Sequence, residues 1–409
     1  MPAAKEYILM LGCFDTKGEE FAFLRECMLS QGEQIKTINT GVFGTTQKFP
    51  VDIEAEQVAL EAGFSLENLR EEADRGHAVE IMGKGVARLV SKLMQEGGIK
   101  AAIGMGGGGG TYIALAALKE IRLGIPKLCL STLASKDVSR LMGSKDITLM
   151  PTIVDVAGLN SISKHLMRQA AAAICAMAKV QSLDAQATTG KVAISMFGNT
   201  STCVDQCIKL LEKQGYEVFT FHANGTGGKT MEALIREGFF DAVLDITTTE
   251  LADDLCEGIC SAGPDRLNAA AEMGIPQVVV PGCLDMVNFA QMDTVPKKYK
   301  ERKLYSWAPD VTLMRTNEEE NRILGEKLAQ KVNQSTAPVT ILLPTKGISQ
   351  IDAEGGVFYQ PEADQALFES IKKHSHAPVK VTEVDAHIND QKFSAYIVNS
   401  LQEMKMREK

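Results

Sequence analysis

The sequence lacks the features that would place it in a membrane or on nucleic acid. No apolar run reaches the length of about 20 residues that a membrane-spanning helix needs. No block is rich in lysine or arginine, and the formal charge at pH 7 is −9, so the electrostatic footprint of a nucleic-acid-binding protein is missing. The first residues, MPAAKEYILMLG, do not have the pattern of a signal peptide. We therefore expect a cytoplasmic protein that binds small molecules, with no nucleic-acid or membrane partner.

Cysteine and histidine occur without the spacings of a nucleophile signature or a disulfide framework. The nine cysteines are an odd number spread over predicted strands and helices, which indicates reduced thiols. None of the six histidines pairs with a cysteine or serine in a recognisable catalytic pattern. Cys203/Cys207 and Cys256/Cys260 are each four apart, a helical spacing that would form a buried face, which we favour, or half of a zinc site. No residue is assigned to a metal on this basis.

What the sequence does contain is a long alternation of apolar strands and helical segments. Strands are expected in the first half over residues 7–12, 34–39, 101–105, 127–132 and 146–150, and in the second half over 191–198, 216–222, 241–247, 276–282, 311–316 and 339–344. The segment QSLDAQATTG (181–190) between the halves is typical of a linker. This rhythm predicts an α/β fold, with two Rossmann-like domains whose parallel sheets face an interdomain cleft. We place a nucleotide-binding domain at 1–184 and a second, substrate-binding domain at 185–409.

The glycine run AAIGMGGGGGTYIALAAL (101–118) lies between a predicted strand and a predicted helix. Glycines let backbone N–H groups close on an anion, and the helix that follows adds its unpaired first-turn donors. We favour a phosphate-binding turn over a mobile hinge. Gly104, Gly106 and Gly109 also satisfy the dinucleotide pattern G-x-G-x-x-G. The run follows the third strand, however, and the next strand ends in Ser131 and Thr132 without the acid that would hold a ribose, so NAD is disfavoured.

A second glycine loop, ANGTGGKT (223–230), resembles a relaxed P-loop with alanine in the first position. In a true P-loop Lys229 would reach the phosphates and Thr230 would hold Mg²⁺. Because the pattern is short, we favour chance as its origin, while Gly225, Gly227 and Gly228 remain candidates for binding some anion. The spacing of Thr247 and Glu250 is that of a capping box that starts a helix.

Polar side chains follow several strands of the second half. Asp245 and Asp285 lie at or just past strand ends, where α/β proteins place chemistry, and Asn288 and Arg266 lie nearby in the sequence. Together these four residues would suit a small anionic substrate and are our candidate catalytic residues. The alternative is that the arginines, Arg315 included, clamp loops and surface carboxylates. Lys346, Ser349 and Asp352 lie in another loop of this kind.

Nine segments match one family along essentially the whole chain: LGCFDTKGEEF (11–21), GMGGGGGT (104–111), STLASKD (131–137), HANGTGG (222–228), LDITTTELADDL (244–255), SAGPDRLNAA (261–270), VVVPGCLDMVNF (278–289), LMRT (313–316) and ISQIDAEGG (348–356). On these motifs the chain resembles the ATP-binding domain family typified by the tomato mosaic virus resistance protein, which has stand-alone bacterial members. One departure is LYSWAPD (304–310), where the family commonly has His-Asn-Pro, so an acid–base role there does not carry over.

The resemblance implies a two-domain protein that binds Mg·ATP through its first half and forms a homodimer. Asp15, Thr16 and Lys17 would line the loop after the first strand. From residue type and position, Asp15 or Asp137 would help to hold Mg²⁺. The remaining ATP-binding residues that the resemblance implies are Gly106, Gly107, Gly108, Gly109, Gly110, Thr111, Ser131, Thr132, Ser135 and Asp137.

Two functions follow as hypotheses. The first is an ATP-dependent enzyme of catabolism that acts on a small anionic metabolite near the four candidate catalytic residues of the second half. The alternative is a non-catalytic regulatory protein that uses ATP to recognise another protein. The polar strand-end residues favour the enzyme, because an adaptor needs no such constellation.

Overall fold

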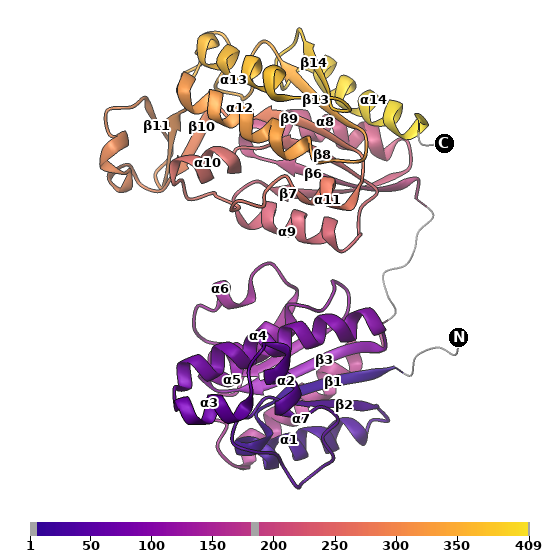
Figure 1. The fold of residues 1–409 in the computed structure, drawn as a ribbon. Coiled ribbons are helices and arrows are strands. Elements are labelled where there is room, and N and C mark those ends of the chain that lie inside the picture. Colours follow the sequence, from indigo (N-terminus) through magenta and orange to yellow (C-terminus); the bar gives the residue numbers. More distant parts are fainter. Residues whose placement is uncertain (1–5, 181–187, 408–409) are drawn as a thin grey trace. The chain divides into compact units, whose positions relative to one another are not determined.

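The computed structural model describes residues 6–180 and 188–407, and the chain divides into two units, Met1–Asp184 and Ala185–Lys409 (Figure 1). Most of the predicted linker, residues 181–187, lies outside the described residues. The predicted α/β class with two Rossmann-like domains is confirmed, since each unit is built on a parallel sheet.

The first unit has a five-stranded parallel sheet in the order β2-β1-β3-β4-β5. Its strands are β1 (Tyr7–Gly12), β2 (Ile35–Asn39), β3 (Ile99–Gly106), β4 (Lys127–Ser131) and β5 (Ile147–Pro151). Its helices are α1 (Phe14–Leu29), α2 (Ala55–Glu61), α3 (Leu66–Glu72), α4 (Arg75–Glu96), α5 (Gly108–Leu118), α6 (Ser139–Met142) and α7 (Ser161–Met177). The chain goes from β1 outward to β2 and then crosses to β3 on the other side, so the topological switch point lies between β1 and β3.

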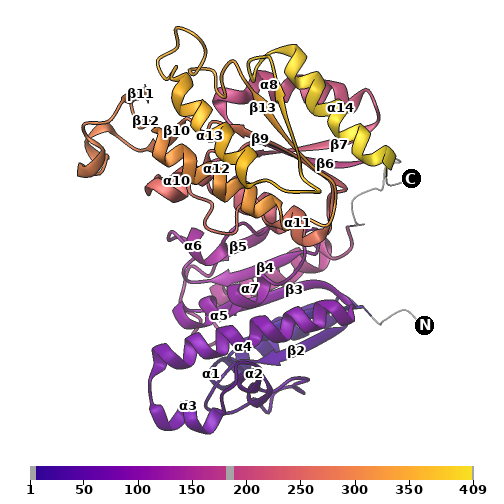
Figure 2. The same cartoon turned by 45° about the horizontal axis from the view of Figure 1, so that its top comes forward.

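Strand β1 shows why this sheet is buried on both faces. Leu9 and Leu11 pack in one apolar cluster with α2, α4 and α5, while Ile8 and Met10 pack in another with α1 and α7 (Figures 1 and 2). Alternate side chains of a strand point to opposite faces, so an uninterrupted apolar run such as YILMLG needs helices on both sides.

The second unit has a six-stranded parallel sheet in the order β14-β13-β9-β8-β6-β7 and a smaller antiparallel sheet, β10-β12-β11. The strands are β6 (Gly190–Met196), β7 (Tyr216–His222), β8 (Ala242–Thr247), β9 (Gln277–Gly282), β10 (Met286–Phe289), β11 (Leu304–Ala308), β12 (Val311–Arg315), β13 (Val339–Pro344) and β14 (Lys380–Val384). The α-helices are α8 (Ser201–Glu212), α9 (Thr226–Arg236), α10 (Glu250–Cys256), α11 (Ala269–Met273), α12 (Glu318–Val332), α13 (Pro361–His374) and α14 (Gln391–Arg407). Three short 3₁₀ turns lie at Gly198–Thr200, Met292–Thr294 and Lys297–Tyr299.

Two sequence interpretations of the second unit are wrong in detail. The segment 311–316 does not join the parallel sheet: β12 pairs antiparallel with β10 and β11 because only Pro309 and Asp310 separate β11 from β12, too few residues for a parallel crossover. Cys256 and Cys260 do not share a helix face, since α10 ends at Cys256. All nine cysteines lie in the described part of the chain and are free thiols.

Candidate functional site

The glycine run forms the turn between β3 and α5, with Gly107 as the N-cap of α5 and no side chain capping the helix. Among the described residues, the N–H groups of Gly108, Gly109 and Gly110 have no hydrogen-bond acceptor. A Cβ built on Gly108 would meet no atom within 4 Å. The start of α5 therefore offers a set of free, solvent-facing donors at the positive end of a helix, which is the local geometry that binds phosphate.

Thr111 and Ser131 stabilise this turn through hydrogen bonds on its buried side. Both are fully buried, and their hydroxyl groups are 2.6 Å apart. The Thr111 hydroxyl also donates to the carbonyl of Gly106 at 3.1 Å, and the Ser131 hydroxyl accepts from the N–H of Leu133 at 2.9 Å. These two residues, predicted to bind the nucleotide, are thus committed to the loop itself and position its glycines.

A cavity of about 460 Å³ opens beside the glycine turn, at the carboxyl ends of β1 and β2 and the start of α4. Gly109 and Gly110 line it together with Asp15 and Thr16 from the loop after β1. One wall is apolar and consists of Val42, Leu69, Val79, Met82 and Ile113. The cavity lies at the switch point between β1 and β3, which is where doubly wound sheets bind ligands, and its volume is within the usual range for ligand sites.

The Asp15 carboxylate is fixed at the edge of this cavity. Its two oxygens accept from the N–H of Thr16 at 2.7 Å and the N–H of Phe43 at 3.0 Å. Gly41 makes this possible, because a Cβ there would lie 2.1 Å from the Asp15 carboxylate. Each oxygen keeps a lone pair, so Asp15 can still accept from a ligand or contribute to a metal ion.

The cavity has two arginines that we did not single out from the sequence, Arg70 and Arg75. The Nε of Arg70 donates to the carbonyl of Val42 at 2.5 Å. The side chain of Arg75, at the first position of α4, has no hydrogen-bond or ion-pair partner among the described residues. Asp74, the N-cap of α4, accepts from the N–H of His77 at 3.0 Å, and this backbone hydrogen bond holds the pKa of its carboxyl below the usual value.

Several of the predicted ATP-binding residues lie away from the cavity wall. Lys17 is at a kink of α1, and Ser135 and Asp137 are exposed in the loop after β4, where Asp137 accepts from the N–H of Ser139 at 3.0 Å. Thr132 is closer, since its hydroxyl lies 3.9 Å from the position of a Cβ on Gly107. The structure thus brings Asp15, Thr16 and the glycine turn together and leaves the end of the β4 loop outside.

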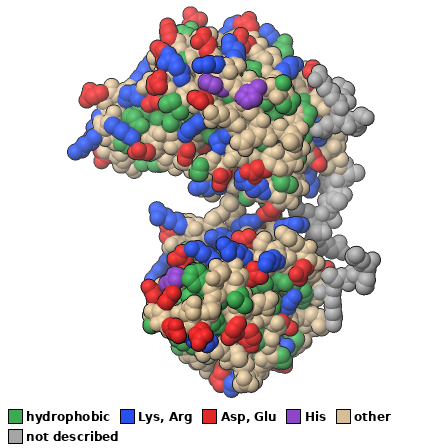
Figure 3. Space-filling view, in the orientation of Figure 1, with side chains coloured by type: hydrophobic (Ala, Val, Ile, Leu, Met, Phe, Trp, Pro, Cys, Tyr) green, Lys and Arg blue, Asp and Glu red, His purple; other side chains and the backbone are tan. Residues whose placement is uncertain are grey.

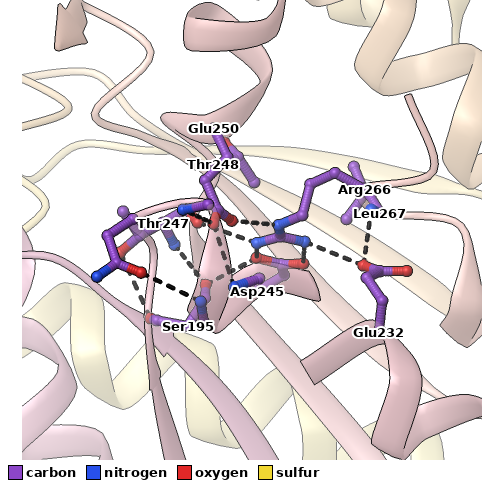
Figure 4. A network of polar contacts seen from close by, with 12 residues as sticks. Ser195, Glu232, Asp245, Thr247, Thr248, Glu250, Arg266 and Leu267 are labelled. Atoms are coloured by element: carbon purple, nitrogen blue, oxygen red, sulfur yellow. Dashed lines mark hydrogen bonds and ion pairs between the residues drawn. The ribbon is translucent and has the colours of Figure 1, made fainter. Parts of the chain in front are cut away.

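In the second unit, Arg266 is the centre of a buried network (Figure 4). Its Nη1 and Nη2 donate to Asp245 at 2.5 and 2.6 Å, and its Nε donates to Glu250 at 2.5 Å. Further bonds run to Glu232 and to the carbonyl of Thr247, each at 3.2 Å. A guanidinium has five N–H donors, and these five bonds use them all. Asp245 and Arg266, two candidate catalytic residues, are therefore together, and every donor of Arg266 is used within the protein.

The side chain of Glu250 occupies the anion-binding position of the second glycine loop. Its Oε1 accepts from the N–H of Gly225 at 2.7 Å and from the N–H of Gly228 at 3.1 Å. The position that a phosphate would take at the start of α9 is thus filled by an internal carboxylate. Glu250 makes no capping bond to its own helix α10, contrary to the capping-box prediction, because its side chain reaches across to α9. Lys229 is exposed and the Thr230 hydroxyl donates to the carbonyl of Thr226, so neither supports a P-loop.

The other two candidate catalytic residues are buried in separate contacts. Asp285 accepts from the Ser349 hydroxyl at 2.7 Å, and burial raises the pKa of its carboxyl to about 6. Asn288 donates to Asp253 at 2.8 Å. Arg315 pairs with Asp352 and Asp364 at 3.3 and 2.7 Å. The predicted anionic-substrate site is therefore divided among internal networks, and its arginines clamp buried carboxylates.

Asp253 gives the second unit a testable pH dependence. Burial raises the pKa of its carboxyl to about 7, whereas an unfolded chain releases this proton near pH 4. Between these values the folded state holds the extra proton, so the free energy of unfolding falls as pH rises from about 4 to about 7, by at most ~1.4 kcal/mol per pH unit. In Asp253→Asn this contribution is absent.

We expect urea unfolding at pH 5.5 and 7.5 to show a smaller pH difference in Asp253→Asn than in the wild type. Asn288 can accommodate the new amide, because its own carbonyl oxygen has no partner among the described residues and can accept after a side-chain flip. An Asp253→Asn protein with the full wild-type pH difference would show that Asp253 is ionised throughout.

Membrane-spanning helices and clusters of metal-binding side chains are both absent from the described residues. No helix in them is long and apolar enough to cross a membrane. No group of three or more His, Cys, Asp and Glu residues in them is arranged to hold a metal ion. On the face in Figure 3, acidic and basic side chains both occur on each unit.

The sequence matches two domain profiles of one family. Residues 6–183 match the profile described as "Uncharacterised protein family (UPF0261) N-terminal domain", and residues 190–405 match the corresponding C-terminal domain. A UPF0261 protein of Clostridium tetani is 43% identical over 395 residues, covering 96% of this chain and 98% of its own.

More distant similarities extend to a plant protein and to a solved structure. The ToMV resistance protein Tm-1(GCR237) of Solanum lycopersicum is 36% identical over 423 residues, covering 97% of this chain and 55% of the tomato protein. A crystal structure of a UDP-N-acetylglucosamine 2-epimerase aligns over 99% of this chain and 98% of its own, with 10% identity and a TM-score of 0.21.

Proposed function

The chain belongs to the uncharacterised protein family UPF0261, and we propose that its first unit binds a nucleotide, as Mg·ATP, in the cavity beside the glycine turn. The observation that carries this proposal is the 460 Å³ cavity at the β1/β3 switch point with Gly109 and Gly110 in its wall. The free N–H groups at the start of α5 would bind phosphate oxygens. The apolar wall around Val79 and Met82 would cover the base.

The contrast between the two glycine loops supports this assignment. Both precede a helix of 11 residues. The loop before α9 has its amides occupied by Glu250, whereas the loop before α5 has free amides and an adjoining cavity. An anion site that the protein fills with its own carboxylate has no room for a ligand, whereas one with free donors can accept a phosphate.

Asp15 is the residue that fits a nucleotide-bound Mg²⁺. Magnesium bound with a nucleotide takes one or two carboxylates, and the remaining ligands are water and phosphate. Asp15 lines the cavity, and both of its oxygens keep lone pairs. Asp137, the other residue named from the sequence, is exposed outside the cavity. The metal would neutralise phosphate charge between Asp15 and the glycine turn.

The direct test is a calorimetric titration with Mg·ATP, ADP, AMP and NAD, followed by a turnover assay. We expect selective binding of Mg·ATP by the full-length protein. Steady ATP hydrolysis would identify an ATP-dependent enzyme, and binding without hydrolysis in the presence of candidate metabolites would identify a nucleotide-dependent regulatory protein. The absence of any nucleotide binding would refute the proposal.

Arg75→Gln should weaken Mg·ATP binding about tenfold, because Arg75 is an unpaired cation at the cavity and would lie near the phosphates. The salt dependence of binding should also decrease. The matched control is Arg122→Gln, which removes an exposed arginine of the same unit that does not line the cavity. Equal affinities of the two variants would remove Arg75 from the site.

A further inference from the structure

The second unit has a cavity of its own, of about 300 Å³, at the carboxyl end of β13. The turn after β13, Pro344–Gly347, forms one side of it, and Tyr359 and the first turns of α13 form another. Ligands of open α/β sheets bind outside the carboxyl ends of the strands, so the position is one that this fold uses for binding. None of the four candidate catalytic residues lines this cavity.

The polar groups in this cavity are rich in hydrogen-bond acceptors. Asp364 is fixed by the bond that its Oδ1 accepts from Arg315 at 2.7 Å, which leaves Oδ2 available. The side chains of Glu354 and Tyr359 have no hydrogen-bond or ion-pair partner among the described residues. Lys346 is the cation of the lining, and it pairs with the exposed Asp385 at 3.0 Å. Two carboxylates and one lysine that already pairs with an aspartate do not suit a phosphate or a carboxylate ligand.

The remaining lining groups suit hydroxyl groups. The side chains of Tyr359 and Gln365 can both donate and accept, as ligand hydroxyls do, and the Thr345 hydroxyl, which donates to the carbonyl of Val384 at 3.2 Å, can still accept. Tyr359 is 41% exposed as a residue, and Phe368 adds a second aromatic side chain to the lining. Aromatic rings provide apolar surface for the C–H face of a ring-shaped ligand.

We propose that this cavity binds a neutral polyhydroxylated molecule of about monosaccharide size. The carboxylates of Glu354 and Asp364 accept its hydroxyl hydrogens, and Tyr359 packs against its C–H face. A volume of about 300 Å³ is at the small end of ligand cavities, which fits one sugar ring and not a nucleotide. This cavity shares no lining residue with the nucleotide cavity of the first unit. Either proposal can therefore be refuted without affecting the other.

The test is ligand-observed saturation-transfer NMR on the full chain with a panel of neutral pentoses, hexoses and polyols, plus amino sugars and sugar phosphates. We expect saturable transfer to at least one neutral member. Glu354→Gln should weaken its binding about tenfold, because a neutral amide accepts a weaker hydrogen bond than a carboxylate, and Tyr359→Ala should weaken it to a similar extent. The control Glu362→Gln changes an exposed carboxylate of α13 outside the lining and should leave affinity unchanged.

The fluorescence of Trp307 supplies a second readout, because it should change when a ligand binds beside Tyr359. It is the one tryptophan of the chain, its ring lies 6.4 Å from Tyr305, and the Tyr305 ring lies 6.4 Å from Phe358, the neighbour of Tyr359.

Three results would overturn the proposal: no saturation transfer to any neutral member of the panel, transfer to amino sugars or sugar phosphates alone, or equal affinities in Glu354→Gln and Glu362→Gln. Circular dichroism of each variant establishes that it is folded.

Discussion

Gly108→Val is expected to abolish Mg·ATP binding while leaving the first unit folded. A Cβ on Gly108 meets no protein atom within 4 Å, and Gly108 is not among the residues with positive φ, so valine costs the fold little. The isopropyl group would instead occupy the space in front of the free N–H groups at the start of α5. A phosphate held there would be displaced, and we expect a loss of at least 100-fold, or about 2.7 kcal/mol of binding free energy.

The matched control is Gly198→Val in the second unit. Gly198 also has no atom within 4 Å of a built Cβ, lies without positive φ at the start of a helical segment and is exposed. Calorimetry should show unchanged Mg·ATP affinity in this variant, and circular dichroism should show both variants folded. Wild-type affinity in Gly108→Val would remove the glycine turn from the nucleotide site, whatever the rest of the cavity binds.

The fold class could be predicted because its signal is local. An apolar run such as YILMLG, followed by a polar turn and a helical segment, indicates a strand buried on both faces wherever it occurs. The signal was absent for β14, KVTEV, an edge strand with two charged residues of five, and this strand was not predicted. It was misleading for β12, where the apolar run VTLMR gives no information about strand direction.

The candidate site could be predicted less completely, because the residues that distinguish a binding loop from a structural loop lie far apart in the sequence. The glycine loops before α5 and α9 look alike, and what separates them is Glu250, which lies 22 residues beyond Gly228. Nothing near ANGTGGKT indicates that a carboxylate will enter it. Asp245, Arg266 and Asp285 likewise have the residue types of a catalytic site, and only the structure shows that they are buried, with Arg266 bonded to Asp245 and Asp285 bonded to Ser349.

The cavity arginines illustrate the same limit. Arg70 lies in α3 and Arg75 begins α4, and neither residue belongs to a glycine-rich motif. The sequence signal that could have found them is Asp74, an N-cap residue that predicts a helix starting at Arg75. A helix that leads back to a parallel strand, as α4 leads to β3, starts at the carboxyl edge of the sheet. Even with that signal, Arg75 and Gly109 are too far apart along the chain for a sequence motif to indicate that they line one cavity.

Arg266→Met is expected to be the most destabilising single change in the second unit. Methionine replaces most of the volume of the arginine side chain but leaves Asp245, Glu232 and Glu250 buried without their shared cation. Breaking a buried ion pair on one side costs about 3–5 kcal/mol. Urea unfolding followed by the fluorescence of Trp307, which lies in this unit, should show a loss of that size.

The control for Arg266→Met is Arg236→Met, which breaks the pair with Glu272 where both side chains are partly exposed, 36% and 45%. Solvent screens that pair, so the expected loss is at most about 1 kcal/mol. Adding Asp245→Asn to Arg266→Met should restore part of the lost stability, since it removes one of the uncompensated charges. If the double variant is no more stable than Arg266→Met, lost packing and not buried charge accounts for the effect. If Arg266→Met unfolds like Arg236→Met, the carboxylates around Arg266 must take up protons readily enough to replace it.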